Sequence, residues 1–125
     1  MSWSWIAITA AQAIHDRQLA EHGGADGIRD PASLESALAR PRNLAAYGKP
    51  DKADLAAAYA FGVARNHPFV DGNKRTAWVI ARLFLAANNF TLTFERDEAI
   101  RTMLGLAAGN VDERALAGWF RERIA

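Results

Sequence analysis

The stretch HPFVDGNKRTA, residues 67–77, decides how the rest of the chain is interpreted. Pro68 disfavours helical backbone at His67, and the run DGN at 71–73 is a turn signal because its glycine adopts positive φ freely. Residues 74–87 are almost wholly apolar, and a helix that is apolar on nearly every side is a buried one. The sequence therefore predicts a turn leading into a central helix over about residues 74–87, which we expect to be the most buried helix of the protein.

The start of this predicted helix is a candidate anion-binding site. Unpaired N–H groups and the positive end of the helix dipole lie there, and Lys74 and Arg75 add two positive charges that are unfavourable without an anion. Gly72 would let the backbone approach a phosphate closely. Asn73 would either donate its amide to a phosphate oxygen or take the left-handed turn conformation. Arg75 offers a fork suited to bidentate phosphate contact, with a solvated arginine as the alternative.

Three further side chains of the stretch have candidate roles. Asp71 would repel a bare phosphate, a conflict that disappears if it binds Mg²⁺, which usually bridges carboxylates to substrate phosphates; a simple helix N-cap is the alternative. His67 is the candidate general base, a role worth about 10²–10⁴-fold, against a histidine that merely packs at a helix end. Phe69 is interpreted as an apolar anchor that pins the loop and holds His67 still, rather than as a substrate contact.

The same stretch closely resembles the signature of the Fic/Doc family, H-[PX]-F-x-[DE]-[GA]-N-[GK]-R. The match is to the Doc (death-on-curing) branch, in which lysine replaces glycine after the asparagine, as Lys74 does here. Doc-like segments elsewhere extend the resemblance over nearly the whole chain, at residues 13–16, 27–30, 34–38 and 58–62. The expected fold is all-α: a compact Fic/Doc-like helical bundle around the helix at about 74–87, with at most one very short strand pair, forming a single domain over residues 1–125.

The resemblance also implies a reaction. In Fic enzymes that transfer adenylyl groups, a glycine stands at the position of Lys74 and a second arginine at that of Trp78. Doc-type proteins depart from this pattern, which implies an inverted nucleotide with its γ-phosphate facing His67. The expected protein is then a kinase that uses ATP and Mg²⁺ to phosphorylate a Ser or Thr hydroxyl of a protein, by resemblance elongation factor Tu, and so arrests translation. Arg82 is expected to extend to solvent rather than replace the missing arginine.

The resemblance further implies a partner, an antitoxin whose disordered C-terminal segment folds as a helix in a groove. The self-inhibitory motif [ST]-x-x-x-E-[GN] of other Fic proteins does not occur in this sequence, so we expect inhibition by a separate chain. Two alternatives stay open: an adenylyltransferase that carries Lys74, and a non-catalytic helical module that docks on DNA or protein.

The composition and net charge of the chain limit its class of fold, its binding partners and its location. A length of 125 residues favours one domain, and a hydrophobic content of 50% argues against disorder. Cysteine is absent, which excludes disulfides and thiolate metal sites. The net charge of +1 favours neither direct nucleic-acid binding nor membrane binding. No basic leader precedes the first apolar run, which His15 and Asp16 interrupt, so we expect neither a signal peptide nor a spanning helix and a cytoplasmic location.

The other elements are predicted from local signals. A capping box of Thr9 and Gln12 would start a helix that stops at Gly23-Gly24, with its two histidines, His15 and His22, facing solvent rather than binding a metal. Asp30-Pro31 would start a short helix that ends at Pro41. The remaining predictions are an extended N-terminus over 2–8, a loop over 40–50, a helix from Asp51 to Asn66, a strand or extended connector over 90–94, and helices over about 96–107 and 112–123.

The predicted loop over 40–50 has two interpretations. By resemblance it would be the flap that lies beside the active site and binds the target. A plain connection anchored by Tyr47 explains the same residues equally well.

Overall fold

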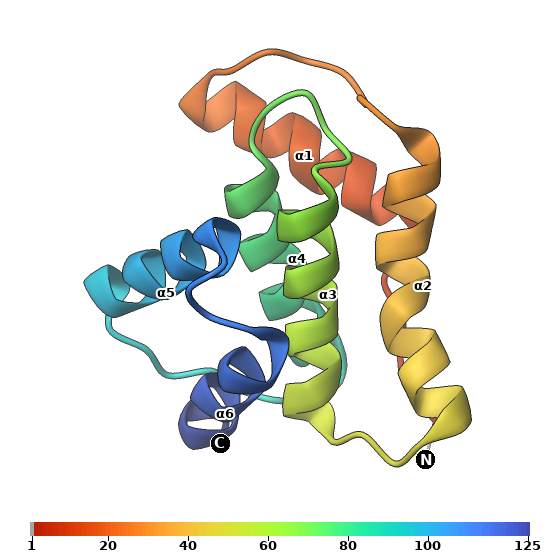
Figure 1. The fold of residues 1–125 in the computed structure, drawn as a ribbon, viewed down its shortest axis with the longest axis vertical. Coiled ribbons are helices and arrows are strands. Elements are labelled where there is room, and N and C mark those ends of the chain that lie inside the picture. The colour runs from red at the N-terminus through yellow and green to blue at the C-terminus, as the bar shows by residue number, and fades with distance from the viewer. Residues whose placement is uncertain (1) are drawn as a thin grey trace.

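The computed structural model describes residues 2–125, and within this range it contains six helices (Figure 1). In chain order they are α1 (Ile8–His22), α2 (Pro31–Tyr47), α3 (Lys52–Asn66), α4 (Asn73–Ala87), α5 (Arg96–Ala108) and α6 (Glu113–Arg123). In the part of the chain described, extended pairing is limited to two isolated bridges, Ile28 with Phe69 and Leu92 with Ile124. The prediction of an all-α bundle is confirmed, and residues 90–94 are an extended connector.

Helix α3 lies at the centre of this bundle and packs against α2, α4, α5 and α6 (Figure 1). Ten of its residues are buried, against six in α4, so the expectation that the helix over 74–87 is the most buried one is wrong. The sequence of α3 is rich in alanine, and small side chains allow close approach on every side. At Gly62 a Cβ would lie only 3.1 Å from the Cα of Ala37. Helix α4 instead turns Leu83 outward, where it is 39% exposed.

Capping side chains determine where two of the helices begin. Asp30 accepts from the Ser33 backbone with Pro31 at the first helical position, and Asp51 forms a capping box with Asp54. Both starts were predicted. The box of Thr9 and Gln12 is wrong, because α1 already begins at Ile8 and has no side-chain cap.

Helix α2 is longer than predicted and continues through Pro41 to Tyr47. A proline inside a helix removes one backbone hydrogen bond, but Pro41 is buried, and its packing against the bundle keeps the helix intact. Residues 40–50 are therefore mostly helix and lie at the end of α2 away from the loop between α3 and α4 (Figure 1). They do not form a flap beside that loop. The segment that does lie beside it is the connection between α1 and α2.

Aromatic residues join the remaining elements to α3 and α4. Trp3 and Trp5 of the extended N-terminus lie on Phe84, with ring centroids 5.9 and 6.0 Å away. On another side of α4, Trp78 contacts rings of the C-terminal part of the chain, namely Phe94, Trp119 and Phe120. Among residues 2–125, no helix combines the length and the apolar character that crossing a bilayer requires.

Candidate anion site at the start of α4

His67 caps the C-terminal end of α3 in a left-handed conformation, with φ 49° and ψ 55°. Such a backbone is unfavourable for a residue with a side chain and persists only where its surroundings enforce it. Pro68 follows and directs the chain out of the helix. The imidazole is exposed, so the candidate base is accessible at the end of the most buried helix.

Arg29 holds this turn from the connection between α1 and α2. Its Nε donates to the His67 carbonyl at 2.7 Å, and its Nη2 donates to the Asn66 carbonyl at 2.8 Å. The backbone N–H of Arg29 also donates to the carbonyl of Pro68 at 2.8 Å. The motif did not reveal this contact; the only signal was the Doc-like segment at 27–30.

His15 packs beneath the loop. Its ring is stacked on Phe69 at 3.8 Å and 6°, and the exposed fractions of the two residues are 2% and 1%. Nε2 of His15 lies 2.8 Å from the carbonyl oxygen of Asp71; since a carbonyl only accepts, Nε2 must carry the proton. The expectation that His15 faces solvent is therefore wrong, because α1 covers the loop with this face. His22 is exposed, as expected.

Asn73 closes the loop on itself. The N–H of Phe69 donates to its Oδ1, and its Nδ2 donates to the carbonyl of Phe69, both at 3.0 Å. The left-handed residue of the turn is Gly72, with φ 77°, while Asn73 is the first residue of α4. The alternative that Asn73 takes the left-handed conformation is wrong. Its amide NH₂ retains one hydrogen for another acceptor.

Asp71 holds the other side of the turn. One carboxylate oxygen accepts from the N–H of Gly72 at 2.8 Å and the other from the N–H of Ala25 at 3.3 Å. These two hydrogen bonds, together with the charges of Arg75 and Lys74, lower the pKa of Asp71 below its usual range. The carboxylate is therefore ionised near neutral pH. Asp71 does not cap α4, which has no side-chain cap.

Gly24 makes the approach to Asp71 possible. Its φ is 124°, and a Cβ there would lie 2.9 Å from Oδ2 of Asp71. Any other residue would have to displace the carboxylate or the backbone.

The first turn of α4 is open. Among residues 2–125, the backbone N–H groups of Asn73, Lys74 and Arg75 have no hydrogen-bond partner, whereas α2, α3, α5 and α6 each begin with a capping Asp or Glu. The Lys74 and Arg75 side chains are exposed. Thr76, in the same turn, is fully buried and its hydroxyl is unpaired. The three backbone N–H groups and the two cationic side chains fit a phosphate group.

The acids near the loop divide into two groups. Asp71 is an exposed, ionised carboxylate, which fits the single protein ligand that Mg²⁺ often takes when it also binds phosphates. His15, Asp16 and Asp26 bring one ligand-type atom each within 4.8 Å of one another. A nitrogen with two carboxylates suits transition metals better than Mg²⁺. Asp16 and Asp26 are both exposed, and contact with solvent alone explains their position.

Two side chains further along α4, those of Trp78 and Arg82, lie toward the C-terminal part of the chain and not at the first turn of the helix. Trp78 stacks on Phe120 and turns toward the C-terminal helices. The guanidinium of Arg82 lies 5.7 Å above the Trp78 ring and 5.0 Å above that of Phe94. As expected, Arg82 does not extend to the start of α4. No side chain of these positions supplies a second arginine to the site.

The geometry thus defines an all-α protein in which an exposed histidine, an ionised carboxylate and an uncapped, cationic helix start share one loop. A model of the Fic/DOC family matches residues 5–85 of the chain. The "Protein kinase doc" of Escherichia phage P1 is 34% identical over 110 residues, which cover 87% of this chain and 86% of the phage protein. The "Toxin Doc" of Mycolicibacterium smegmatis is 41% identical over 100 residues, 76% of each protein. The chain belongs to the Fic/DOC family.

Proposed function

We propose that this protein is a Doc-like toxin that transfers the γ-phosphate of ATP to a Ser or Thr hydroxyl of a protein. The observation that carries the proposal is the open start of α4, where unpaired N–H groups, Lys74 and Arg75 adjoin an ionised Asp71 and the exposed His67. The names of the two relatives, a kinase and a toxin, support the same function.

The nucleotide would be held by its phosphates. The N–H groups at the start of α4, with Gly72 allowing close approach, suit the phosphate oxygens, and the side chains of Asn73, Lys74 and Arg75 add a donor and two charges. Asp71 would hold Mg²⁺ against the same oxygens. Bound ATP with Mg²⁺ supplies a transferable phosphoryl group, whose transfer depends mainly on positioning and charge neutralisation.

His67 would take the proton of the attacking hydroxyl. Its ring is exposed at the mouth of the loop, so a hydroxyl of a folded protein can approach it without opening the bundle. A neutral imidazole nitrogen would accept the proton while the hydroxyl oxygen attacks the γ-phosphorus, and the bond from that phosphorus to the bridging oxygen would break to release ADP. Solvent would later remove the proton from His67.

Phosphoryl transfer is preferred to adenylyl transfer because of Lys74 and Trp78. The lysine stands where adenylyl-transferring relatives have glycine, and Trp78 packs among aromatic rings where they have a second arginine. The lysine side chain narrows the space for outer phosphates at the helix start, and the missing arginine removes one phosphate donor. Both changes disfavour a nucleotide whose outer phosphates are buried and whose α-phosphate faces His67. Adenylyl transfer remains the second candidate, and a non-catalytic binding module the third.

The cellular role is proposed from the family resemblance. The target would be elongation factor Tu, the outcome arrested translation, and the location the cytoplasm. An antitoxin would inhibit the protein by folding its C-terminal segment as a helix in a groove.

Labelled ATP tests the proposal. The protein is incubated with Mg²⁺, bacterial extract and α- or γ-labelled ATP, beside His67→Ala and Asp71→Ala. His22→Ala and Asp97→Ala are the controls, since both residues are exposed and lie outside the loop. We expect one γ-labelled protein band that both loop variants lose, His67→Ala by about 10²–10⁴-fold, and both controls keep.

Label from the α-position would establish adenylyl transfer instead. A His67→Ala variant that remained fully toxic in cells would favour a binding module. No label from either position, with purified elongation factor Tu also present, would contradict the proposed reaction.

A further inference from the structure

The imidazole of His67 has no hydrogen bond or ion pair among residues 2–125. The backbone at His67 therefore fixes the direction of the Cα–Cβ bond from which the ring extends. That backbone adopts the left-handed conformation with φ 49°, in which a residue with a side chain rests only where its neighbours enforce it. The contacts that fix the main chain at this point thus decide where Cβ of His67 lies and which positions its ring can reach.

Arg29 supplies these contacts from outside the signature. Its two donors reach two consecutive carbonyls, those of Asn66 and His67, at 2.8 and 2.7 Å. Carbonyls in the last turn of a helix lack intrahelical partners, and they carry the negative end of the helix dipole, which a cation stabilises. A planar guanidinium meets both carbonyls with two nitrogens in a fixed fork, whereas a lysine offers a single nitrogen on a flexible stem.

Arg29 is itself held in place. Its backbone N–H and that of Asp30 both donate to the carbonyl of Pro68, at 2.8 and 3.1 Å. Asp30 is fixed in turn as the cap of α2. These backbone hydrogen bonds thereby place the Arg29 guanidinium against the turn that follows α3. The residue is exposed, so truncating its side chain removes these hydrogen bonds without opening a cavity in the core.

We infer that Arg29 is a positioning residue: it fixes the left-handed turn at His67 and so holds the imidazole in register with the start of α4. This inference rests on the proposed function. Arg29 contacts the end of α3 and not the donors at the start of α4. Its loss therefore lowers kcat and leaves the KM for ATP unchanged.

The test is steady-state phosphoryl transfer by wild type, Arg29→Ala and Arg29→Lys, with Arg101→Ala as the control because Arg101 is exposed on α5. Misplacing a base by about 1 Å costs roughly 10²-fold, so we expect Arg29→Ala to lose about that much in kcat, with a KM for ATP within about twofold. Arg29→Lys should be intermediate, and Arg101→Ala should match wild type. A raised KM with unchanged kcat would overturn the inference.

A double-mutant cycle separates positioning from general damage. If Arg29 acts through His67, then Arg29→Ala should cost almost nothing further in a His67→Ala background, because coupled residues are not additive. An undiminished further loss would overturn the inference.

If no transfer is found, that result contradicts the proposed function but not the positioning role. NMR tests the positioning role independently of activity. The ring and backbone resonances of His67 should shift or broaden in Arg29→Ala, while those of His22 stay unchanged. Identical His67 signals in the two proteins would overturn the positioning role whatever the activity.

Discussion

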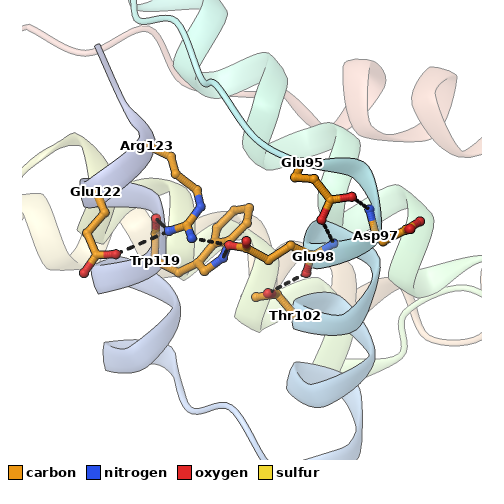
Figure 2. A network of polar contacts seen from close by, with 7 residues as sticks. All are labelled: Glu95, Asp97, Glu98, Thr102, Trp119, Glu122 and Arg123. Carbon is orange, nitrogen blue, oxygen red and sulfur yellow. Dashed lines mark hydrogen bonds and ion pairs between the residues drawn. The ribbon is translucent and has the colours of Figure 1, made fainter.

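The start of α4 on one side of the molecule, and the contact between α5 and α6 on the other, use their polar groups in opposite ways. At the start of α4, three backbone N–H groups and two cations have no protein partner in the described chain. Toward α5 and α6, Glu98 accepts from the indole of Trp119 at 2.7 Å and pairs with Arg123, whose guanidinium lies 4.4 Å above the Trp119 ring (Figure 2). Donors without a protein partner can bind a ligand, whereas donors already paired within the protein stabilise its fold. We therefore expect substitutions to affect activity on the first side and stability on the second.

The largest effect should come from the aromatic side. Phe120 is fully buried and contacts Trp78 and Trp119, so Phe120→Ala should cost about 3–5 kcal/mol of unfolding free energy through the cavity it leaves. Denaturant titration measures this cost. Transfer activity per folded molecule should stay at the wild-type level, and a loss of activity beyond the unfolded fraction would break the division between the two sides.

Asn73 should show effects of both kinds, because it lies at the site and its two hydrogen bonds in this structure go to Phe69. Asn73→Ala leaves the N–H and C=O of buried Phe69 without partners, and we expect a loss of about 1–3 kcal/mol together with reduced transfer. Asn73→Asp keeps the acceptor and loses the donor, so its cost should be smaller. Unchanged denaturation midpoints in both variants would show that His15 and Arg29 hold the loop alone.

The smallest effect is the pH dependence at Asp71. Hydrogen bonds from Gly72 and Ala25 lower the pKa of Asp71 below 3.8 in the folded protein. A carboxylate with a depressed pKa contributes stability that is full above its unfolded pKa and is lost as pH falls through the folded value. The melting temperature of Asp71→Asn should thus lie slightly below that of wild type at neutral pH and converge with it in acid. A difference in melting temperature that persisted in acid would show that packing, and not the charge of Asp71, causes it.

Asp51 provides the reference for this measurement. At the other end of α3, a hydrogen bond from Arg121 lowers the pKa of Asp51 to about 2. Its contribution is likewise lost between pH 3.8 and about 2, so Asp51→Asn should show the same convergence without any effect on transfer.

Much of the fold was predictable because its signals are local. Caps at Asp30 and Asp51 marked two helix starts, and Gly23 and Pro68 marked two ends. The extent of α2 was not predictable, since the burial of Pro41 overrides its helix-breaking tendency. The extensive burial of α3 was not predictable either. Its many alanines allow other helices to pack closely against it, but alanine is common in exposed helices as well.

The sequence by itself determined which groups share the loop: His67, Asp71, Gly72 and the two cations are neighbours along the chain, and their proposed roles follow from that order. Only the tertiary structure decided what holds them. His15 and Arg29 lie 56 and 38 residues from their carbonyl partners in the loop. Backbone preference and hydrophobic periodicity reach only a few residues along a chain. Partners this distant are chosen when α1 and the segment after it pack over the loop.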